Sequence, residues 1–527
     1  MIYNDIYETV DGNMSCSNIG SRKNRNIRDH LFVINGIVND VINNKDTKDI
    51  DIQIYDVAKC FDKLEYTNTA IDLYNAGVID DKFVTIANSN TNCDVAVKTP
   101  WGSKTARTNL SNIEMQGTVL AGLKCSVSID TIGKEALDNT HNILYKYKNC
   151  TSIPPLSLVD DILAVSVCST ESVKMNATIQ AKVVGKQLEL GHKKCFQMHV
   201  GKNQSCCPTL SVHGKVMKTA KQEKYLGEIL SCDSRIDRNI LERYNKGIGI
   251  GNQIFGMLKE VSFGFYYFEM AMMFRNSMLI NGILCSIESV YGLNKIHIEQ
   301  LELCDKILMK KMFNSVSTTP IEAYYLETNT LPLRFVVLAR RVMYYWGILQ
   351  KSDTELVKQV FRAQQLCPVK NDWCLKIQED LAYLDINLNE SEICAMKKLK
   401  FKSYLNTKIK EAGLKYLLTL KNKHTKSDNL CVASQMQSYL ISNKLSFSEK
   451  QLLFKFRTHN YNCRANYKTQ YGSNLACLIC AEEDTQIHLL QCKKTTIGVD
   501  LEGVQYSDIF SSIEKQVRIT KVLKKIT

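Results

Sequence analysis

The sequence predicts an α+β protein with a mixed first part, a helical second part and a short cysteine-containing tail. Residues 50–58, IDIQIYDVA, alternate apolar and polar side chains and predict a strand within the first part. From about residue 235 to about 460, apolar residues recur almost everywhere at helical spacing. From about residue 450 a polar tail follows, which contains the sequence CLIC. The length of 527 residues is enough for two or three domains.

Charge and cysteine content narrow the class of protein only partly. The net charge of +13 fits a polyanionic partner such as nucleic acid, and it fits a generally basic soluble protein equally well. The 20 cysteines are spread along the chain, and the first residues lack the basic start and apolar core of a secretory signal. We therefore expect reduced cysteines and an intracellular location, in the nucleus or the cytoplasm. No uninterrupted apolar run approaches about 18 residues, so no membrane partner is expected.

The remaining elements of the first part follow from periodicity and turn residues. The alternating and helical patterns predict a helix around 32–41, a helix-turn-helix over 70–90, a hairpin over 95–110, a helix over 117–137, a hairpin over 156–167, a helix around 170–190, and strands in 196–200 and 224–230.

Two adjacent aspartates, Asp160 and Asp161, lie between apolar runs in the stretch LSLVDDILAV. Taken alone, this pattern favours a tight hairpin turn, since aspartate tolerates turn geometry. The alternative is a divalent metal site, because adjacent carboxylates repel each other unless a cation neutralises them. Such a site needs a third carboxylate. Asp56 ends the strand at 50–58, although it could equally cap a helix, as could Asp62.

Several motifs in a fixed order carry a family resemblance. YDVAKCFDKL, EMQGTVLAG, LSLVDDILAV, KKCFQMHVGK and EKYLGEIL resemble successive palm motifs of the reverse transcriptases of non-LTR (LINE-type) retrotransposons. NIGSRKNRNIRDHLFVIN resembles the segment of the fingers before the palm. The resemblance implies a right-hand polymerase with an antiparallel palm sheet. Its expected parts are partial fingers (1–50), the palm (51–235), a helical thumb and connection (236–350), a helical linker region (351–450) and a zinc-knuckle region (451–527).

The resemblance implies an RNA-directed DNA polymerase that extends a DNA primer on an RNA template with deoxynucleoside triphosphates. Two Mg²⁺ ions activate the primer hydroxyl and stabilise pyrophosphate in this chemistry. Asp56 and Asp160 would bridge both ions, and Asp161 would complete the shell of one. Lys194 would donate a proton to pyrophosphate, although Lys193 is adjacent and a solvated lysine is the simpler explanation.

Further roles follow by position in the motifs. Phe61 would exclude a 2′-hydroxyl, with core packing as its alternative. The other positions are nucleotide and template contacts at Gln116 and Gly117, the primer grip at Tyr225, Leu226 and Gly227, and phosphate contacts at Arg22, Lys23, Arg25 and Arg28. For these four basic residues a solvated basic face is the alternative.

The tail contains a C-x2-C-x7-H-x3-C pattern formed by Cys477, Cys480, His488 and Cys492. Thiolates and imidazole at this spacing predict structural, tetrahedral Zn²⁺, and the pattern resembles the zinc knuckle that ends many of these retrotransposon proteins. A reduced cysteine cluster is the alternative, and Cys463 could compete as a ligand. The preceding residues 454–468, FKFRTHNYNCRANYK, combine basic and aromatic residues and predict binding of single-stranded nucleic acid.

One departure from the family bears on activity. Family members have longer fingers and an endonuclease domain before the polymerase, so the resemblance implies an N-terminally truncated copy. The alternative function is therefore a catalytically inactive retrotransposon remnant that binds nucleic acid. An unrelated metal-dependent nuclease is disfavoured, because the QG and YLG motifs would have no role in it.

Overall fold

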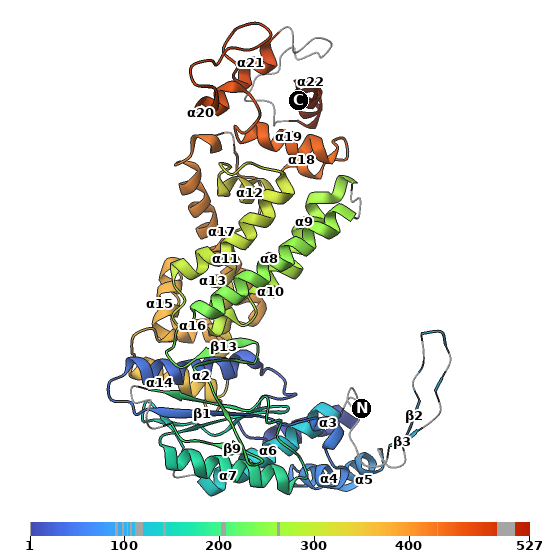
Figure 1. Cartoon of the computed structure of the whole chain (residues 1–527), viewed down its shortest axis with the longest axis vertical. Helices are drawn as coiled ribbons and strands as arrows, with labels where there is room; N and C mark the ends of the chain where they lie inside the picture. The colour runs from blue at the N-terminus through green and yellow to red at the C-terminus, as the bar shows by residue number, and fades with distance from the viewer. Residues whose placement is uncertain are drawn as a thin grey trace. The chain divides into compact units, whose positions relative to one another are not determined.

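The computed structural model describes residues 2–89, 93–96, 98, 100–102, 104–105, 108–110, 120–140, 144–201, 207–260, 264–428, 430–492 and 512–526. The chain divides into two compact units (Figure 1). The first unit comprises Met1–Ile236, Glu288–Gly292 and Tyr344–Glu379. The second comprises Asp237–Ile287, Leu293–Met343 and Asp380–Thr527.

The first unit is built on a five-stranded sheet in the order β11-β8-β1-β7-β6. The central strand β1 (Ile50–Asp56) pairs antiparallel with both β7 (Asp161–Ser166) and β8 (Phe196–Val200). β6 (Leu156–Leu158) pairs antiparallel with β7, and β11 (Lys218–Thr219) pairs parallel with β8. Residues 50–55 of β1 are all buried, as expected for a central strand covered on both faces. The predicted mixture of α and β structure is confirmed.

Helices cover both faces of this sheet (Figure 1). α6 (Ala121–Thr140) and α7 (Ser169–Gly185) pack against each other, and α7 contacts β1 and β7. Their buried residues recur at spacings of three and four, which places one apolar stripe of each helix in a shared core. α2 (Ile27–Asn43) lies on the other face and packs against β8. α14 (Leu356–Leu366) packs against α2.

Smaller elements complete the first unit. They are α1 (Ile2–Asn13), α3 (Cys60–Lys63), α4 (Tyr66–Asn75), α5 (Asp80–Ser89) and the hairpins β2–β3 (Cys93–Val95, Thr108–Leu110), β4–β5 (Lys146–Tyr147, Thr151–Ser152), β9–β10 (Ser211–Val212, Lys215–Val216) and β12–β13 (Gln222–Tyr225, Glu228–Ser231).

The second unit consists of helices in its described residues. The longest are α8 (Asp237–Glu260), α11 (Lys295–Phe313), which packs along α8, and α17 (Lys398–Lys421). The others include α9 (Tyr267–Phe274), η4 (Arg275–Ile280), α10 (Asn281–Ile283), α12 (Ile321–Thr328), α16 (Glu390–Ala395), α18 (Ser438–Ile441), α19 (Phe447–Arg457), α20 (Lys468–Tyr471), α21 (Gln486–Gln491) and α22 (Ile513–Ile526). α13 (Leu333–Leu349) and α15 (Trp373–Tyr383) each begin in one unit and end in the other.

The range 351–450, expected as one helical linker region, is helical but divided between the units. Residues up to Glu379 belong to the first unit and those from Asp380 to the second. The division has a packing cause, because α14 buries Val357, Val360 and Phe361 and packs on α2.

One described segment, Tyr267–Ser289, has the length and mean hydropathy (1.2) of a membrane-crossing helix. In the sequence, Arg275 and two asparagines, Asn276 and Asn281, interrupt its apolar residues. In the structure, 44% of its most apolar window is buried, and Arg275 donates to both carboxylate oxygens of Asp305 on α11 at 2.6 Å. A buried bidentate ion pair with a neighbouring helix is what a core helix of a folded domain shows. The segment is not one α-helix, since the π-helix η4 interrupts it.

Candidate active site and candidate zinc site

Three carboxylates converge at one end of the central strands. Asp56 is the last residue of β1 and lies directly opposite Asp161, the first residue of β7. Asp160 belongs to the two-residue turn between β6 and β7, and its carbonyl accepts a hydrogen bond of 2.9 Å from the Val57 N–H. Antiparallel register therefore brings together acidic residues that are more than 100 positions apart in the sequence.

The turn that carries Asp160 is strained. Val159, its first residue, has φ of +55°, a backbone conformation that is unfavourable for a β-branched side chain. Its side chain packs against the core cluster of the first unit. Gly20 supports the turn closely, because a Cβ there would lie 2.9 Å from the Val159 nitrogen. Such strain persists only where the surroundings impose it, and it is typical of functional sites.

Lys194 completes the charge cluster. Its Nζ donates to Asp56 Oδ1 at 2.8 Å, while 72% of its side chain remains exposed. This hydrogen bond raises the pKa of Lys194, so the side chain stays protonated. Lys193 has no such contact with Asp56 among the described residues, so the geometry favours Lys194 for the role predicted in this motif. The Gly191 N–H donates to the Asp56 carbonyl at 2.7 Å, and a Cβ at Gly191 would lie 2.8 Å from Asp56 Oδ2.

The carboxylates destabilise one another in their charged forms. Burial, followed by the charges of Asp160 and Asp56, raises the pKa of Asp161 to about 6. Burial and the charge of Asp56 likewise raise the pKa of Asp160. One lysine cannot neutralise three carboxylates, whereas a divalent cation would relieve their repulsion. Carboxylate oxygens on adjacent strands are the hard ligands that Mg²⁺ prefers, so this donor set fits that ion.

A cleft of about 260 Å³ joins the carboxylates to the β12–β13 hairpin. Asp56, Asp161, Tyr225 and Leu226 all line it. Leu226 and Gly227 form the hairpin turn with φ of +47° and +86°, as a two-residue turn of this kind requires. The structure therefore places the predicted primer-grip residues beside the predicted catalytic residues.

Four lysines also line this cleft, namely Lys193, Lys194, Lys218 and Lys224, and Lys218 is paired there with Glu223. Sequence analysis singled out neither Lys218 nor Lys224. The available signal was the lysine-rich run KVMKTAKQEK at 215–224, which has no motif spacing of its own. Clustered ammonium groups beside carboxylates suit a ligand that carries phosphates.

The nucleotide-binding predictions have different outcomes. Phe61, in α3, is partly buried and packs against the core cluster, in agreement with the core-packing alternative. The contact does not test whether the ring also limits access of a nucleotide sugar. Gln116 and Gly117 lie outside the described residues.

The predicted phosphate contacts near the N-terminus are mostly engaged within the protein. Arg22 is buried and donates to the Asp11 carboxylate at 2.6 Å and to backbone carbonyls. Arg25 pairs with Glu355. Arg28 pairs with Glu288 at 2.6 Å, and its side chain is 39% exposed.

Arg22 and Arg25 are therefore neutralised within the protein, which leaves their guanidinium groups less free for the predicted phosphate contact. Lys23 is exposed, with its Nζ 4.4 Å from the centre of the Tyr7 ring. Among the four it is the residue best placed to meet a phosphate.

The aromatic residues of the segment 454–468 are mostly core residues. Phe454, Phe456 and Tyr461 are at most 1% exposed, and Arg457 is buried in an ion pair of 2.6 Å with Glu327. Buried rings cannot stack on bases, so these residues do not form the predicted surface for single-stranded nucleic acid.

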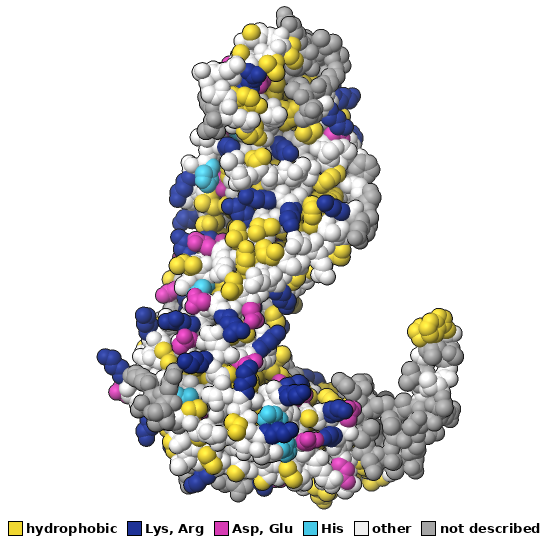
Figure 2. All heavy atoms as spheres, viewed as in Figure 1, with side chains coloured by type: hydrophobic (Ala, Val, Ile, Leu, Met, Phe, Trp, Pro, Cys, Tyr) yellow, Lys and Arg dark blue, Asp and Glu magenta, His cyan; other side chains and the backbone are white. Residues whose placement is uncertain are grey.

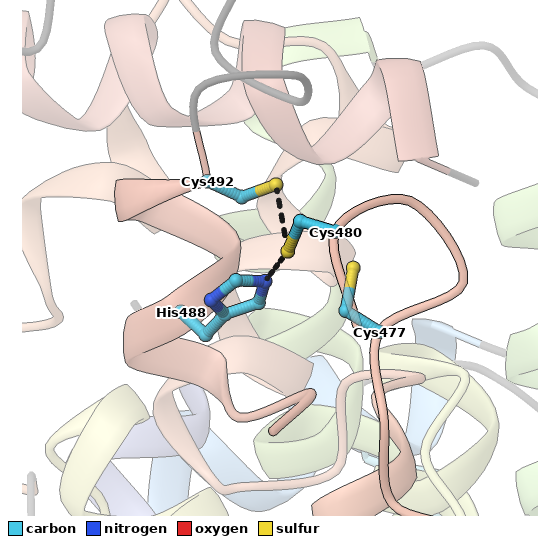
Figure 3. A group of neighbouring side chains, drawn as sticks. All are labelled: Cys477, Cys480, His488 and Cys492. Carbon is cyan, nitrogen blue, oxygen red and sulfur yellow. Dashed lines mark hydrogen bonds between the residues drawn. The ribbon is translucent and has the colours of Figure 1, made fainter. Parts of the chain in front are cut away.

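The four predicted zinc ligands converge in the second unit (Figure 3). Their ligand atoms all lie within 4.8 Å of one another, including a Cys480 Sγ to His488 Nε2 distance of 3.1 Å and a Cys492 Sγ to Cys480 Sγ distance of 3.7 Å. Three sulfurs and one imidazole nitrogen at such separations fit tetrahedral Zn²⁺. Cys463 is buried outside this group.

The surroundings of this group suit a metal site. His488 Nδ1 lies 3.0 Å from a carboxylate oxygen of Glu482, which leaves Nε2 facing the thiols. Burial acts to raise the pKa of the Cys477 thiol, but N–H groups of Ile479 and Cys480 donate to its sulfur, so the pKa is lowered. The Glu482 contact orients the imidazole, and the two N–H groups favour the thiolate form of Cys477 that binds a metal ion. Sequence analysis did not identify Glu482, which lies inside the seven-residue spacer.

Comparison with known proteins gives no family assignment. No protein-family model matches the chain, and no curated protein matches it. Among solved structures, an apo telomerase from Candida tropicalis is 11% identical with a TM-score of 0.37, over 77% of this chain and 61% of that chain. A telomerase from Candida albicans in complex with a TWJ fragment of telomeric RNA is 11% identical with a TM-score of 0.32, over 73% of this chain and 55% of that chain.

The chain thus spans about half to three-fifths of the length of these solved chains. Likenesses of this size carry no functional weight, and the assignment rests on the residues of the site.

Proposed function

We propose that this chain is an RNA-directed DNA polymerase that transfers nucleotides to a primer by two-metal chemistry, as its resemblance to non-LTR retrotransposon reverse transcriptases implies. The observation that carries the proposal is the cluster of Asp56, Asp160 and Asp161 at the end of two paired strands. The burial and mutual repulsion of these carboxylates and the strained backbone at Val159 all destabilise the folded chain, and such features are typical of functional sites.

The chain's own residues have distinct parts in this chemistry. Asp56 and Asp160 would hold both metal ions, and Asp161, which lies opposite Asp56 in the β1–β7 pair, would complete the shell of one of them. Mg²⁺ ions bound there would supply the charge that activates the primer hydroxyl and stabilises pyrophosphate. Lys194, kept protonated by Asp56, holds a proton beside the carboxylates that can pass to a leaving phosphate oxygen.

The substrates follow from the same cleft and from the motif order. The lysines that line the cleft suit the phosphates of a deoxynucleoside triphosphate and of the primer–template backbone. Tyr225 and Leu226, which line the same cleft as Asp56 and Asp161, would position the primer end. RNA as the template rests on the resemblance of the palm motifs. The Cys477 group would bind one structural Zn²⁺, which requires reduced thiols and agrees with a nuclear or cytoplasmic location.

A primer-extension assay tests the proposal. The purified chain receives oligo-dT annealed to poly-rA, dTTP and Mg²⁺, and the double variant Asp160→Asn, Asp161→Asn is compared with the wild type. The chain offers a matched control, because Asp80 and Asp81 are also adjacent but exposed, and Asp80→Asn, Asp81→Asn preserves their shape.

We expect extension by the wild type and the control, and a loss of at least 10³-fold in the site variant, in line with electrostatic catalysis by fixed groups. Equal extension by the site variant would refute the assigned carboxylates. Binding of the template–primer without extension by the wild type would refute the polymerase and support the nucleic-acid-binding remnant.

A further inference from the structure

The positive charge of this protein is concentrated in one short segment of the second unit. Residues 397–426 contain ten lysines and one acidic residue, Glu411, so they carry +9 of the chain's net +13. The other 497 residues of the chain together carry only +4. Most of the segment is α17, a helix of 24 residues.

α17 is attached to its unit by a narrow apolar stripe. Its buried residues recur every fourth position, at Phe401, Leu405, Ile409, Gly413 and Leu417. The attachment is close, since a Cβ at Gly413 would lie 2.6 Å from a side-chain atom of Leu331. Tyr416 also packs against Phe335 and Arg334, whereas most lysines of the segment are exposed.

These lysines are not neutralised by the parts of the second unit that the structure describes. Lys408 lies 3.3 Å from Asp385, but Lys398, Lys400, Lys402 and Lys410 form no ion pair with any described residue. Figure 2 shows Lys and Arg side chains gathered along the edge of the molecule over α17. Like charges at such spacing repel one another unless counterions or a polyanion cover them.

We propose that the exposed lysines of α17 bind the sugar–phosphate backbone of a nucleic-acid duplex. The inference rests on the proposed function, because it identifies where that function's template–primer is held in addition to the cleft. A helix of this length is about 36 Å long, close to one turn of a duplex. Lysine ammonium groups without base-reading partners provide affinity without sequence preference.

The other polyanion with which a basic helix associates is a membrane surface. A helix that lies on a membrane inserts an apolar face into the lipid. The apolar stripe of α17 is buried within its unit instead, and the large apolar residues that α17 exposes are few, with Leu399 at 81% and Leu418 at 36%. The geometry therefore favours nucleic acid.

The test measures binding of a labelled rA–dT duplex by the full chain across a series of salt concentrations. The variant Lys398→Gln, Lys400→Gln, Lys402→Gln, Lys410→Gln removes four charges from α17 at little cost in helix propensity. The matched control is Lys45→Gln, Lys48→Gln, Lys146→Gln, Lys174→Gln, which removes four exposed lysines of the first unit.

We expect the α17 variant to reduce the slope of log K against log salt by about 2 or more, since each lost phosphate contact contributes about 0.9. Its affinity at 100 mM salt should fall at least tenfold, and the control should change the slope by less than about 1. Equal losses in both variants would overturn the inference, because net charge alone would then explain binding.

Unchanged duplex binding by the α17 variant together with normal primer extension would overturn the inference and leave the proposed function intact. If the wild-type chain extends no primer and the α17 variant loses duplex binding, the inference is supported and the proposed polymerase function is refuted. Vesicles of phosphatidylserine and phosphatidylcholine replace the duplex in a parallel titration. Loss of vesicle binding without loss of duplex binding would assign α17 to membranes and overturn the inference.

Discussion

Asp161→Asn should stabilise the metal-free protein. Asparagine keeps the shape of the side chain and removes the charge that burial, followed by the charges of Asp160 and Asp56, makes unfavourable. In the folded chain the pKa of Asp161 is about 6, compared with an ordinary value of 3.8. The folded state therefore binds a proton more tightly than the unfolded state does, and deprotonation of Asp161 opposes folding.

The pKa difference gives the size and sign of this effect. Each tenfold change in proton affinity is worth about 1.4 kcal/mol, so the full difference corresponds to about 3 kcal/mol. Solvent screening of this partly exposed group reduces the expected gain to about 1 to 2 kcal/mol at pH 7.5. The sign follows from linkage, since wild-type stability falls as pH rises from about 4 to about 6. The advantage of the variant should be full above pH 6 and vanish below about pH 4.

Urea unfolding in EDTA at several pH values measures this advantage, with Asp81→Asn as the exposed control. In Mg²⁺ the wild type should become more stable than the variant, because Mg²⁺ binds to the native state and only the wild type keeps all of its carboxylate ligands. Wild-type Mg²⁺ affinity should also weaken as pH falls below about 6, where Asp161 becomes protonated. A variant that is no more stable than the wild type in EDTA, or a difference that does not depend on pH, would refute the account of mutual repulsion.

Three further substitutions have defined outcomes. Gly191→Ala should reduce primer extension at least tenfold with a small change in urea midpoint, because the new Cβ would lie 2.8 Å from Asp56 Oδ2. Normal primer extension by this variant would contradict the prediction and show that the loop around Gly191 can shift. Glu482→Gln should weaken zinc binding about 10- to 100-fold in competition with a chelating dye, since it removes the carboxylate that orients a ligand imidazole. Arg275→Met should lower the free energy of unfolding by about 3 to 5 kcal/mol by leaving Asp305 buried and unpaired. Adding Asp305→Leu should recover part of that loss, and no recovery would argue against the ion pair as the cause.

The sequence was most informative where local patterns and short spacings decide the structure. Alternation predicted β1, and the apolar flanks of Asp160 and Asp161 predicted the hairpin that the structure shows. The C-x2-C-x7-H-x3-C spacing predicted the four side chains that converge in the second unit. In these cases the residues that decide the geometry lie within about 16 positions of one another or follow strand periodicity.

Local sequence was less informative where the packed fold supplies a residue's partner or buries its side chain. Arg22 and Arg25 look like phosphate contacts in sequence, but Asp11 and Glu355 neutralise them in the fold. The Glu355 carboxylate is 330 positions from its partner, so no local pattern could reveal the pair. Likewise, Phe454 reads as an exposed ring in a basic segment and is a core residue in the structure. Burial is a property of the packed chain, and local composition predicts it poorly.

The backbone that supports the Asp160 turn comes from far along the chain. The Ile19 N–H donates to the Ser157 carbonyl at 3.1 Å and the Ser157 N–H donates to the Ser17 carbonyl at 3.1 Å, so the N-terminal segment extends the β6 edge of the sheet. β1 must also pair with β8, which ends at Val200. Contacts of such high sequence separation slow folding, because long loops must close before they form. During synthesis the central strand of the sheet that holds the carboxylate cluster can therefore be paired on both sides only after Val200 has left the ribosome, and the β6 edge stays unprotected until residues 17–19 dock on it.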